Sequence, residues 1–327
     1  MNIDKINIQN FTVFKDIDIV FNKGINLIIG ENGTGKTHLL KVLYIGCQQI
    51  KSKTPSDNIF YKYFQVDNNA LFKNIKNGNP KIMLETDCIS VETEITNKII
   101  SSTKTSAKDY SSTNATFIPS KDILTHSRGF IALSHKFNVP FDNTYIDIIN
   151  QSLLPNLREI PQLGKNILPK LKKIIGGKVI VENDTFYIQK TNGSKIKFSV
   201  EAEGVKKIAI LWQLIMNESI TKDSILFWDE AEANINPSLY KDIATILLEL
   251  SRQGVQIFLA THNYNFAKYI DVLSTDNDNI SYTSFYKTKD NNVTYESEEK
   301  FNYLTKNSLR DDNINLYDEE LKKGFKK

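Results

Sequence analysis

The segment that most restricts the fold of this chain is G-E-N-G-T-G-K-T at residues 30–37, which directly follows the apolar run I-N-L-I-I. Its spacing fits G-x-x-x-x-G-K-[S/T], a turn in which glycines let successive backbone N–H groups point inward at phosphate oxygens. Apolar residues at 39–45 predict a helix whose positive end faces the same anion. Strand, loop and helix in this order predict that the chain binds a nucleoside triphosphate.

The loop also assigns individual roles. Lys36 supplies a positive charge for the outer phosphates, and Thr37 supplies a hydroxyl for Mg²⁺. The residues expected to contact the nucleotide are Gly30, Asn32, Gly33, Thr34, Gly35, Lys36 and Thr37.

A second part of the site is predicted far along the chain. The run I-L-F-W-D-E at 225–230 is typical of a buried parallel strand that delivers carboxylates at its C-terminal edge, where open α/β sheets bind ligands. We expect Asp229 to hold Mg²⁺ and Glu230 to polarise the water that attacks the γ-phosphate. A second apolar strand, 255–260, ends near His262, a candidate sensor of the γ-phosphate. Apolar residues at helical spacing in 239–250 complete a βαβ crossover between the two strands.

The rest of the chain predicts an α/β protein with a mixed central sheet, an N-terminal antiparallel subsheet and an inserted α+β lobe. Strands are expected at 6–8 and 17–21, then at 81–84, 89–95 and 115–118, with an exposed loop at 101–113. A helical region at 121–175, interrupted by Pro155, Pro161 and Pro169, precedes strands at 179–181, 186–188 and 196–200. A hairpin at 280–286 and 293–296 ends the fold. We therefore divide the chain into a head at 1–50 and 200–327 and a lobe at 51–199.

Composition places few further limits. The net charge of +3 neither requires nor excludes a nucleic-acid partner, and the lysine groups at 170–173, 206–207 and 322–327 are expected to be solvated. Cys47 and Cys88 match no metal-binding or redox spacing. No uninterrupted apolar segment resembles a signal peptide or spans a bilayer, so a cytoplasmic protein without a membrane partner is expected.

Three motifs together carry a family resemblance: G-E-N-G-T-G-K-T, W-D-E-A-E-A-N-I-N-P at 228–237, and L-A-T-H-N at 259–263. They resemble the ABC-type ATPases that include RecF and the SMC heads. More closely, they are similar to bacterial stand-alone AAA-family ATPases related to OLD and RecF-like proteins, many of which accompany nucleases or toxins in phage defence. The segments F-I-P-S-K at 117–121 and H-S-R-G-F at 126–130 resemble that subgroup's lobe.

The resemblance implies ATP and Mg²⁺ as ligands and gives roles to matching residues. Lys36 and Thr37 would be the Walker A ligands, Asp229 the Walker B acid, Glu230 the catalytic base and His262 the switch histidine. A D-loop would lie at 233–236. The signature would be E-A-E-G at 201–204, in which Gly204 matches the family pattern and would contact the nucleotide.

The chain departs from the family at several positions. Ala202 stands where a serine is expected, which removes one hydrogen bond across a dimer and implies slower turnover or reliance on Lys206 and Lys207. Thr12 stands where many relatives carry arginine. For the Q-loop, Gln65 and the segment near Lys121 are equal candidates. Structural roles are expected for His126, Ser127 and Arg128, because loop histidine and arginine side chains often satisfy backbone carbonyls.

The resemblance implies a homodimer or higher oligomer in which two heads enclose ATP and control a partner nuclease or toxin in phage defence. The alternative is a RecF-like DNA-repair ATPase that binds DNA directly. A transporter subunit is disfavoured by the strand-rich segment at 81–118 and by the altered signature. A small-molecule kinase is disfavoured because Asp229, Glu230 and His262 suit water activation better than phosphorylation of a substrate.

Overall fold

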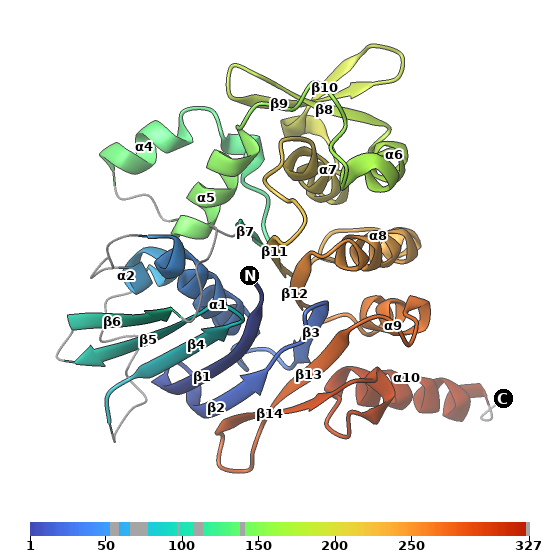
Figure 1. The fold of residues 1–327 in the computed structure, drawn as a ribbon. Helices are drawn as coiled ribbons and strands as arrows, with labels where there is room; N and C mark the ends of the chain where they lie inside the picture. Colours follow the sequence, from blue (N-terminus) through green and yellow to red (C-terminus); the bar gives the residue numbers. More distant parts are fainter. Residues whose placement is uncertain (53–58, 66–77, 97–98, 107–113, 138–140, 325–327) are drawn as a thin grey trace.

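The computed structural model describes residues 1–52, 59–65, 78–96, 99–106, 114–137 and 141–324. Its centre is a six-stranded sheet (Figure 1) in which five strands are parallel and the edge strand β14 is antiparallel. In spatial order its strands are β14 (Val293–Glu298), β13 (Ile280–Lys287), β3 (Ile25–Gly30), β12 (Gln256–Ala260), β11 (Ile225–Asp229) and β7 (Ala115–Ile118). The predicted mixed sheet is therefore confirmed.

Alternation along the central strands gives the protein two hydrophobic cores. In β11, Leu226 and Trp228 belong to one core, whereas Phe227 belongs to the other. Both faces are buried, which explains why these strands are continuous apolar runs. The first core is covered by helices α7 (Glu203–Met216), α8 (Tyr240–Arg252) and α9 (Tyr264–Leu273), and the second by helix α1 (Lys36–Lys51).

The second core is closed by an antiparallel sheet on the far side of α1 (Figure 1). Its strand order is β2 (Phe14–Val20), β1 (Ile3–Phe11), β4 (Lys81–Thr86), β5 (Ile89–Thr96) and β6 (Ile99–Ser106). The predicted N-terminal pair is confirmed. The loop expected at 101–113 is wrong for 101–106, which form part of edge strand β6, and 107–113 lie outside the described residues.

Helices and a small sheet make up most of the segment from 121 to 200. They comprise the turn η1 (Leu124–His126), helices α4 (Phe130–Lys136), α5 (Asn143–Ser152) and α6 (Gly164–Ile175), and strands β8 (Gly177–Glu182), β9 (Thr185–Lys190) and β10 (Lys195–Lys197). Two predictions are corrected here. Pro169 lies inside α6, on its exposed face, where water can reach the carbonyl that proline leaves unpaired. Residues 198–200 form the 3-10 turn η2 rather than a strand.

The short helix α2 (Ile59–Phe64) packs against α1, and the 3-10 turn η3 (Pro237–Leu239) precedes α8. The strand pairings place the strands at 81–118 in the same two sheets as the N-terminal and C-terminal strands. The division into a head at 1–50 and 200–327 and a lobe at 51–199 stays a prediction.

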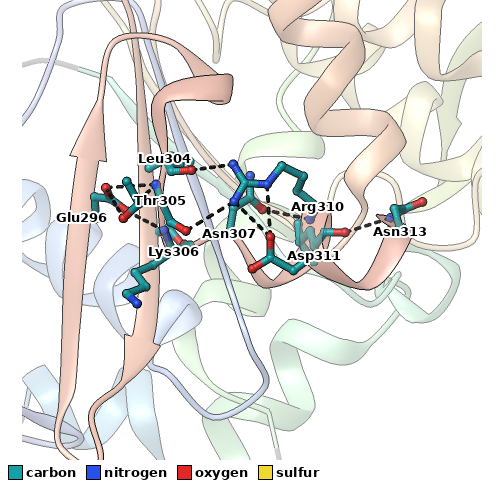
Figure 2. Close-up of polar contacts among 10 residues, drawn as sticks. Glu296, Leu304, Thr305, Lys306, Asn307, Arg310, Asp311 and Asn313 are labelled. Carbon is teal, nitrogen blue, oxygen red and sulfur yellow. Dashed lines mark hydrogen bonds and ion pairs between the residues drawn. The ribbon is translucent and has the colours of Figure 1, made fainter. Parts of the chain in front are cut away.

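The C-terminal hairpin β13–β14 leads through η4 (Phe301–Tyr303) to helix α10 (Ser308–Gly324), which projects from the body (Figure 1). Figure 2 shows how its start is anchored. The Glu296 carboxylate accepts hydrogen bonds from the backbone N–H groups of Thr305 and Lys306, and the Arg310 guanidinium donates to the carbonyl of Leu304. None of the described residues of α10 is buried.

No helix among the described residues is both long and apolar enough to cross a membrane.

Candidate nucleotide site

The five parallel strands end at one edge of the central sheet, and the predicted site residues lie at that edge. Asp229 pairs in register with Ala260, and Ala260 pairs with Ile28, two residues before Gly30. The chain reverses into loops at these points, so strand β3 ends in the glycine loop, β11 in the paired acids and β12 in Thr261–His262. The topology therefore brings together segments about 190 and 230 positions apart in the sequence.

The glycine loop has the backbone that its sequence predicts. Gly30, Gly33 and Gly35 have φ values of 141°, 75° and 93°, conformations that glycine adopts most readily. The Lys36 ammonium donates hydrogen bonds of 2.8 Å to the carbonyls of Gly30 and Glu31, which holds it against the loop. Burial lowers the pKa of Lys36 to about 8, against the opposing pull of the nearby carboxylates of Asp229 and Glu230. Phosphate oxygens would further favour its charged form.

Thr37 and Asp229 form the first cross-chain pair of the site. The Thr37 hydroxyl lies 3.1 and 3.0 Å from the two carboxylate oxygens of Asp229. Burial raises the pKa of Asp229 to about 6, and the Thr37 hydrogen bond lowers it in part. No group of three or more His, Cys, Asp or Glu side chains suited to a metal occurs in the described part of the chain. The Thr37 hydroxyl and the Asp229 carboxylate fit Mg²⁺, which uses few protein ligands and takes its remaining ligands from phosphate and water.

Glu230 and His262 form the second pair. The His262 Nε2 atom lies 3.5 Å from Glu230 Oε1, and both side chains are about one-third exposed. Burial lowers the pKa of His262, as does the charge of Lys36, while Glu230 opposes this shift. A neutral imidazole beside a partly solvated carboxylate can orient a water molecule, and the carboxylate can accept its proton. Glu230 has a φ of 49°, an uncommon backbone conformation that is often found at functional sites.

Two residues support this pair in roles that were not predicted from the sequence. The buried Glu232 accepts a hydrogen bond of 3.0 Å from the backbone N–H of His262, which fixes the loop after β12. Lys207, on α7, donates a 2.8 Å hydrogen bond to the backbone carbonyl of Glu230. The motif D-E-A-E was a signal for Glu232, but the position of Lys207 depends on tertiary packing.

The predicted signature lies at the start of α7, whose N-cap is the exposed Ala202. A Cβ atom on Gly204 would lie 2.7 Å from the carbonyl oxygen of Asn234, so only glycine lets α7 approach the predicted D-loop this closely. Contact between Gly204 and a nucleotide stays a prediction.

The two lysines that follow are buried and have partners inside the chain. Lys206 and Lys207 are 4% and 2% exposed. The Lys206 ammonium lies 3.3 Å from the Asp122 carboxylate, and Lys207 is bonded to Glu230. The expectation that both lysines are solvated is therefore wrong, whereas a role for them across a dimer stays a prediction.

The Q-loop alternatives differ in position. Residue Ile118 of β7 pairs with Trp228, so the segment that ends at Lys121 leaves the sheet at the same edge as Asp229. Gln65 instead follows helix α2. The Ser127 hydroxyl donates to the carbonyl of Asp184, which is a structural role, whereas His126 and Arg128 are exposed.

Comparison with known families gives one match that covers most of the chain. The sequence profile of the family described as "AAA domain, putative AbiEii toxin, Type IV TA system" matches residues 25–268.

Individual relatives match only short segments. The DNA replication and repair protein RecF of Lactobacillus acidophilus is 37% identical over 57 residues, which is 17% of this chain and 15% of RecF. The DNA double-strand break repair Rad50 ATPase of Pyrococcus abyssi is 44% identical over 46 residues, 14% of this chain and 5% of Rad50. The chain therefore matches only a small part of the length of either relative.

Solved structures agree over nearly the whole chain. The SMC head domain from Thermotoga maritima superposes with a TM-score of 0.54 at 14% identity, covering 91% of this chain and 100% of that domain. A Pyrococcus furiosus Smc head bound to the C-terminal domain of ScpA gives a TM-score of 0.55 at 12% identity, covering 91% and 96%. These likenesses show the fold of a P-loop ATPase head.

Proposed function

This chain belongs to the AAA-domain family whose profile spans residues 25–268, among ATPases of the ABC, RecF and SMC-like type, and from that premise we propose that it hydrolyses ATP with Mg²⁺. In this proposal Lys36 and the loop N–H groups hold the phosphates. Thr37 and Asp229 hold the metal, Glu230 is the general base and His262 senses the γ-phosphate.

The observation that carries this proposal is the pairing of groups from distant segments at one sheet edge. The Thr37 hydroxyl contacts the Asp229 carboxylate, and the His262 imidazole lies beside the Glu230 carboxylate. Both pairs lie next to the loop that carries Lys36. A metal bridging the phosphates needs the hydroxyl and the carboxylate together. An attacking water needs an acceptor for its proton, and the partly solvated carboxylate of Glu230 can serve as that acceptor.

We further propose that two heads close on ATP as a homodimer or higher oligomer and thereby control a partner nuclease or toxin in phage defence. The family description, which names a putative toxin system, supports this role. So does the position of the signature on α7, because Lys207 on that helix holds the backbone of Glu230. Contact with a second protein is documented for the Pyrococcus furiosus Smc head, which binds ScpA.

The test uses Glu230→Gln, with Glu218→Gln as a matched control. Glu218 is an exposed glutamate that also has a positive φ, 58°, at the end of α7. Loss of a general base costs about 10²- to 10⁴-fold in turnover, so the Glu230 variant should bind ATP and accumulate as the closed dimer in light scattering. The control should hydrolyse ATP like the parent protein. Equal turnover in both variants would contradict the assignment of Glu230, and absence of ATP-dependent assembly would contradict the dimer.

A RecF-like DNA-repair ATPase is the second candidate, favoured by the local identity to RecF and Rad50. It predicts that ATP strengthens binding to duplex DNA and that salt weakens it, because phosphate contacts release counterions. Binding to DNA that is insensitive to ATP would contradict this alternative.

A further inference from the structure

A cavity away from the predicted nucleotide site opens between the loop after α5, the β8–β9 hairpin and helix α7. Its volume of about 470 Å³ lies within the usual range for ligand pockets. Its lining includes Leu154, Asn156, Ile180, Val181, Asp184 and Gln213. None of the described residues that line it belongs to the phosphate loop or to the paired acids.

Two buried acceptors on residues that line this cavity have no donor among the residues that the structure describes. The Gln213 side chain is 1% exposed, and its Nε2 atom donates a 2.9 Å hydrogen bond to the carbonyl of Ser152. Exchanging its amide atoms would set oxygen against oxygen, so the Ser152 carbonyl fixes the orientation and leaves Oε1 unpaired within the described residues. Asn156 Oδ1 is buried and unpaired in the same way. Buried polar atoms are usually satisfied, so both acceptors point to a ligand that carries N–H donors.

The charge and the walls of the cavity narrow the class of ligand. Asp184 is the one charged side chain among the described lining residues, and no ion pair within the described chain engages it. The Ser127 hydroxyl donates to the backbone carbonyl of Asp184 and so anchors the hairpin turn that carries this exposed carboxylate. Leu154, Ile180 and Val181 provide apolar walls. The ligand should therefore combine an aliphatic stem with a cationic head that donates several hydrogen bonds.

The loop between α5 and α6, which lines one side of the cavity through Leu154 and Asn156, favours a protein as the source of that group. Leu154, Leu157 and Ile160 on this loop are 49%, 40% and 52% exposed. Several exposed apolar side chains on one loop are typical of a protein interface, and a cavity beside them can take one anchoring side chain.

We propose that this cavity binds an arginine side chain presented by a partner protein, with apolar neighbours of that arginine resting on Leu154, Leu157 and Ile160. A guanidinium has five N–H donors and no acceptor, which suits the two amide oxygens and the carboxylate. Its three-carbon stem suits the apolar walls. The binding step is independent of the proposed ATP hydrolysis.

The place of the cavity would let such a partner act on the nucleotide site. Gln213 lies on α7, the helix whose Lys207 holds the Glu230 carbonyl. The loop after α5 follows a helix whose N-cap, Asp142, forms an ion pair of 2.6 Å with Lys41 of α1. This consequence rests on the proposed function, whereas the binding test below does not.

The test measures binding of a fluorescein-labelled peptide, acetyl-Leu-Arg-Leu-amide, by polarisation to the full chain without nucleotide. The matched peptide replaces arginine by citrulline, which keeps the shape but removes the charge and one donor group. The arginine peptide should bind at least about tenfold more tightly, as expected for charged hydrogen bonds. Free n-butylguanidinium, tested as a competitor, should bind more weakly than the peptide because it lacks the apolar neighbours.

Variants locate the site. Asp184→Asn should weaken the peptide about two- to fivefold, as for a partly exposed ion pair, and Gln213→Leu by about tenfold. Asp223→Asn is the matched control, since Asp223 is another exposed aspartate with a positive φ, 65°, outside the cavity. If Gln213→Leu fails to fold, Asn156→Leu tests the second acceptor.

Equal affinity for the arginine and citrulline peptides, or affinity unchanged in Asp184→Asn and both amide variants, would overturn the proposal. Tighter binding of free n-butylguanidinium than of the peptide would overturn the partner protein as its source.

Discussion

Replacing Gly35 by alanine should destabilise the protein more than the same change at Gly33, although both glycines lie in the phosphate loop with positive φ. A left-handed backbone costs a non-glycine residue roughly 1–2 kcal/mol, and both variants incur this cost. A Cβ at Gly33 would meet nothing closer than the Lys287 ammonium at 4.0 Å. A Cβ at Gly35 would lie 2.5 Å from the ring of Phe14 and 2.6 Å from Val13.

The Phe14 ring has little room to move away. It is 1% exposed and packs against Phe285, with ring centroids 5.6 Å apart. Overpacking of this kind costs about 1–3 kcal/mol, so the total loss should be about 2–5 kcal/mol for Gly35→Ala and about 1–2 kcal/mol for Gly33→Ala. Urea unfolding followed by circular dichroism measures both free energies. Equal losses in the two variants would refute the role assigned to the contact between the loop and Phe14.

Two further changes test contacts around the core. Lys207→Met leaves the Glu230 carbonyl without its ammonium donor, so the free energy of unfolding should fall by about 1–3 kcal/mol, and an unchanged urea midpoint would contradict this. Asp278→Asn breaks a bidentate ion pair with Arg252. In the parent protein this ion pair lowers the pKa of Asp278 to about 2, from an ordinary value near 3.9. The stability from this lowered pKa is present above about pH 4 and is lost as the pH falls towards 2. Because the arginine is 43% exposed, the variant should lose about 1–2 kcal/mol at pH 6 and much less at pH 2.5, and a difference independent of pH would contradict the assignment.

The phosphate loop, the strand with the paired acids and the strand before His262 could be predicted because their signals are local. Each consists of a buried apolar strand followed directly by polar residues. The crossover between β11 and β12 was also predictable, because the apolar residues of α8 recur at helical spacing.

Strand β6 and helix α10 were missed for a common physical reason. Strand β6 is an edge strand whose sequence, I-I-S-S-T-K-T-S, is largely polar, so it resembles a loop. Helix α10 has no buried residue among those described and therefore lacks the apolar periodicity that marks a packed helix. Periodicity reports burial on one face, and neither element provides enough of it.

The supporting part of the site could not be read from the sequence. Lys206 and Lys207 resemble a solvated pair, yet packing buries both and gives each a partner inside the chain. The Gln213 acceptor is likewise defined by a contact with Ser152, about 60 positions away. Such roles depend on tertiary contacts rather than on local spacing.

The most direct test of the central claim is calorimetric titration of ATP into the protein and into Asp229→Asn, each with and without Mg²⁺. If Thr37 and Asp229 hold the metal on the triphosphate, Mg²⁺ should strengthen ATP binding to the parent protein and have little effect on the variant. No heat of ATP binding in the parent protein, or the same gain from Mg²⁺ in both proteins, would contradict the account.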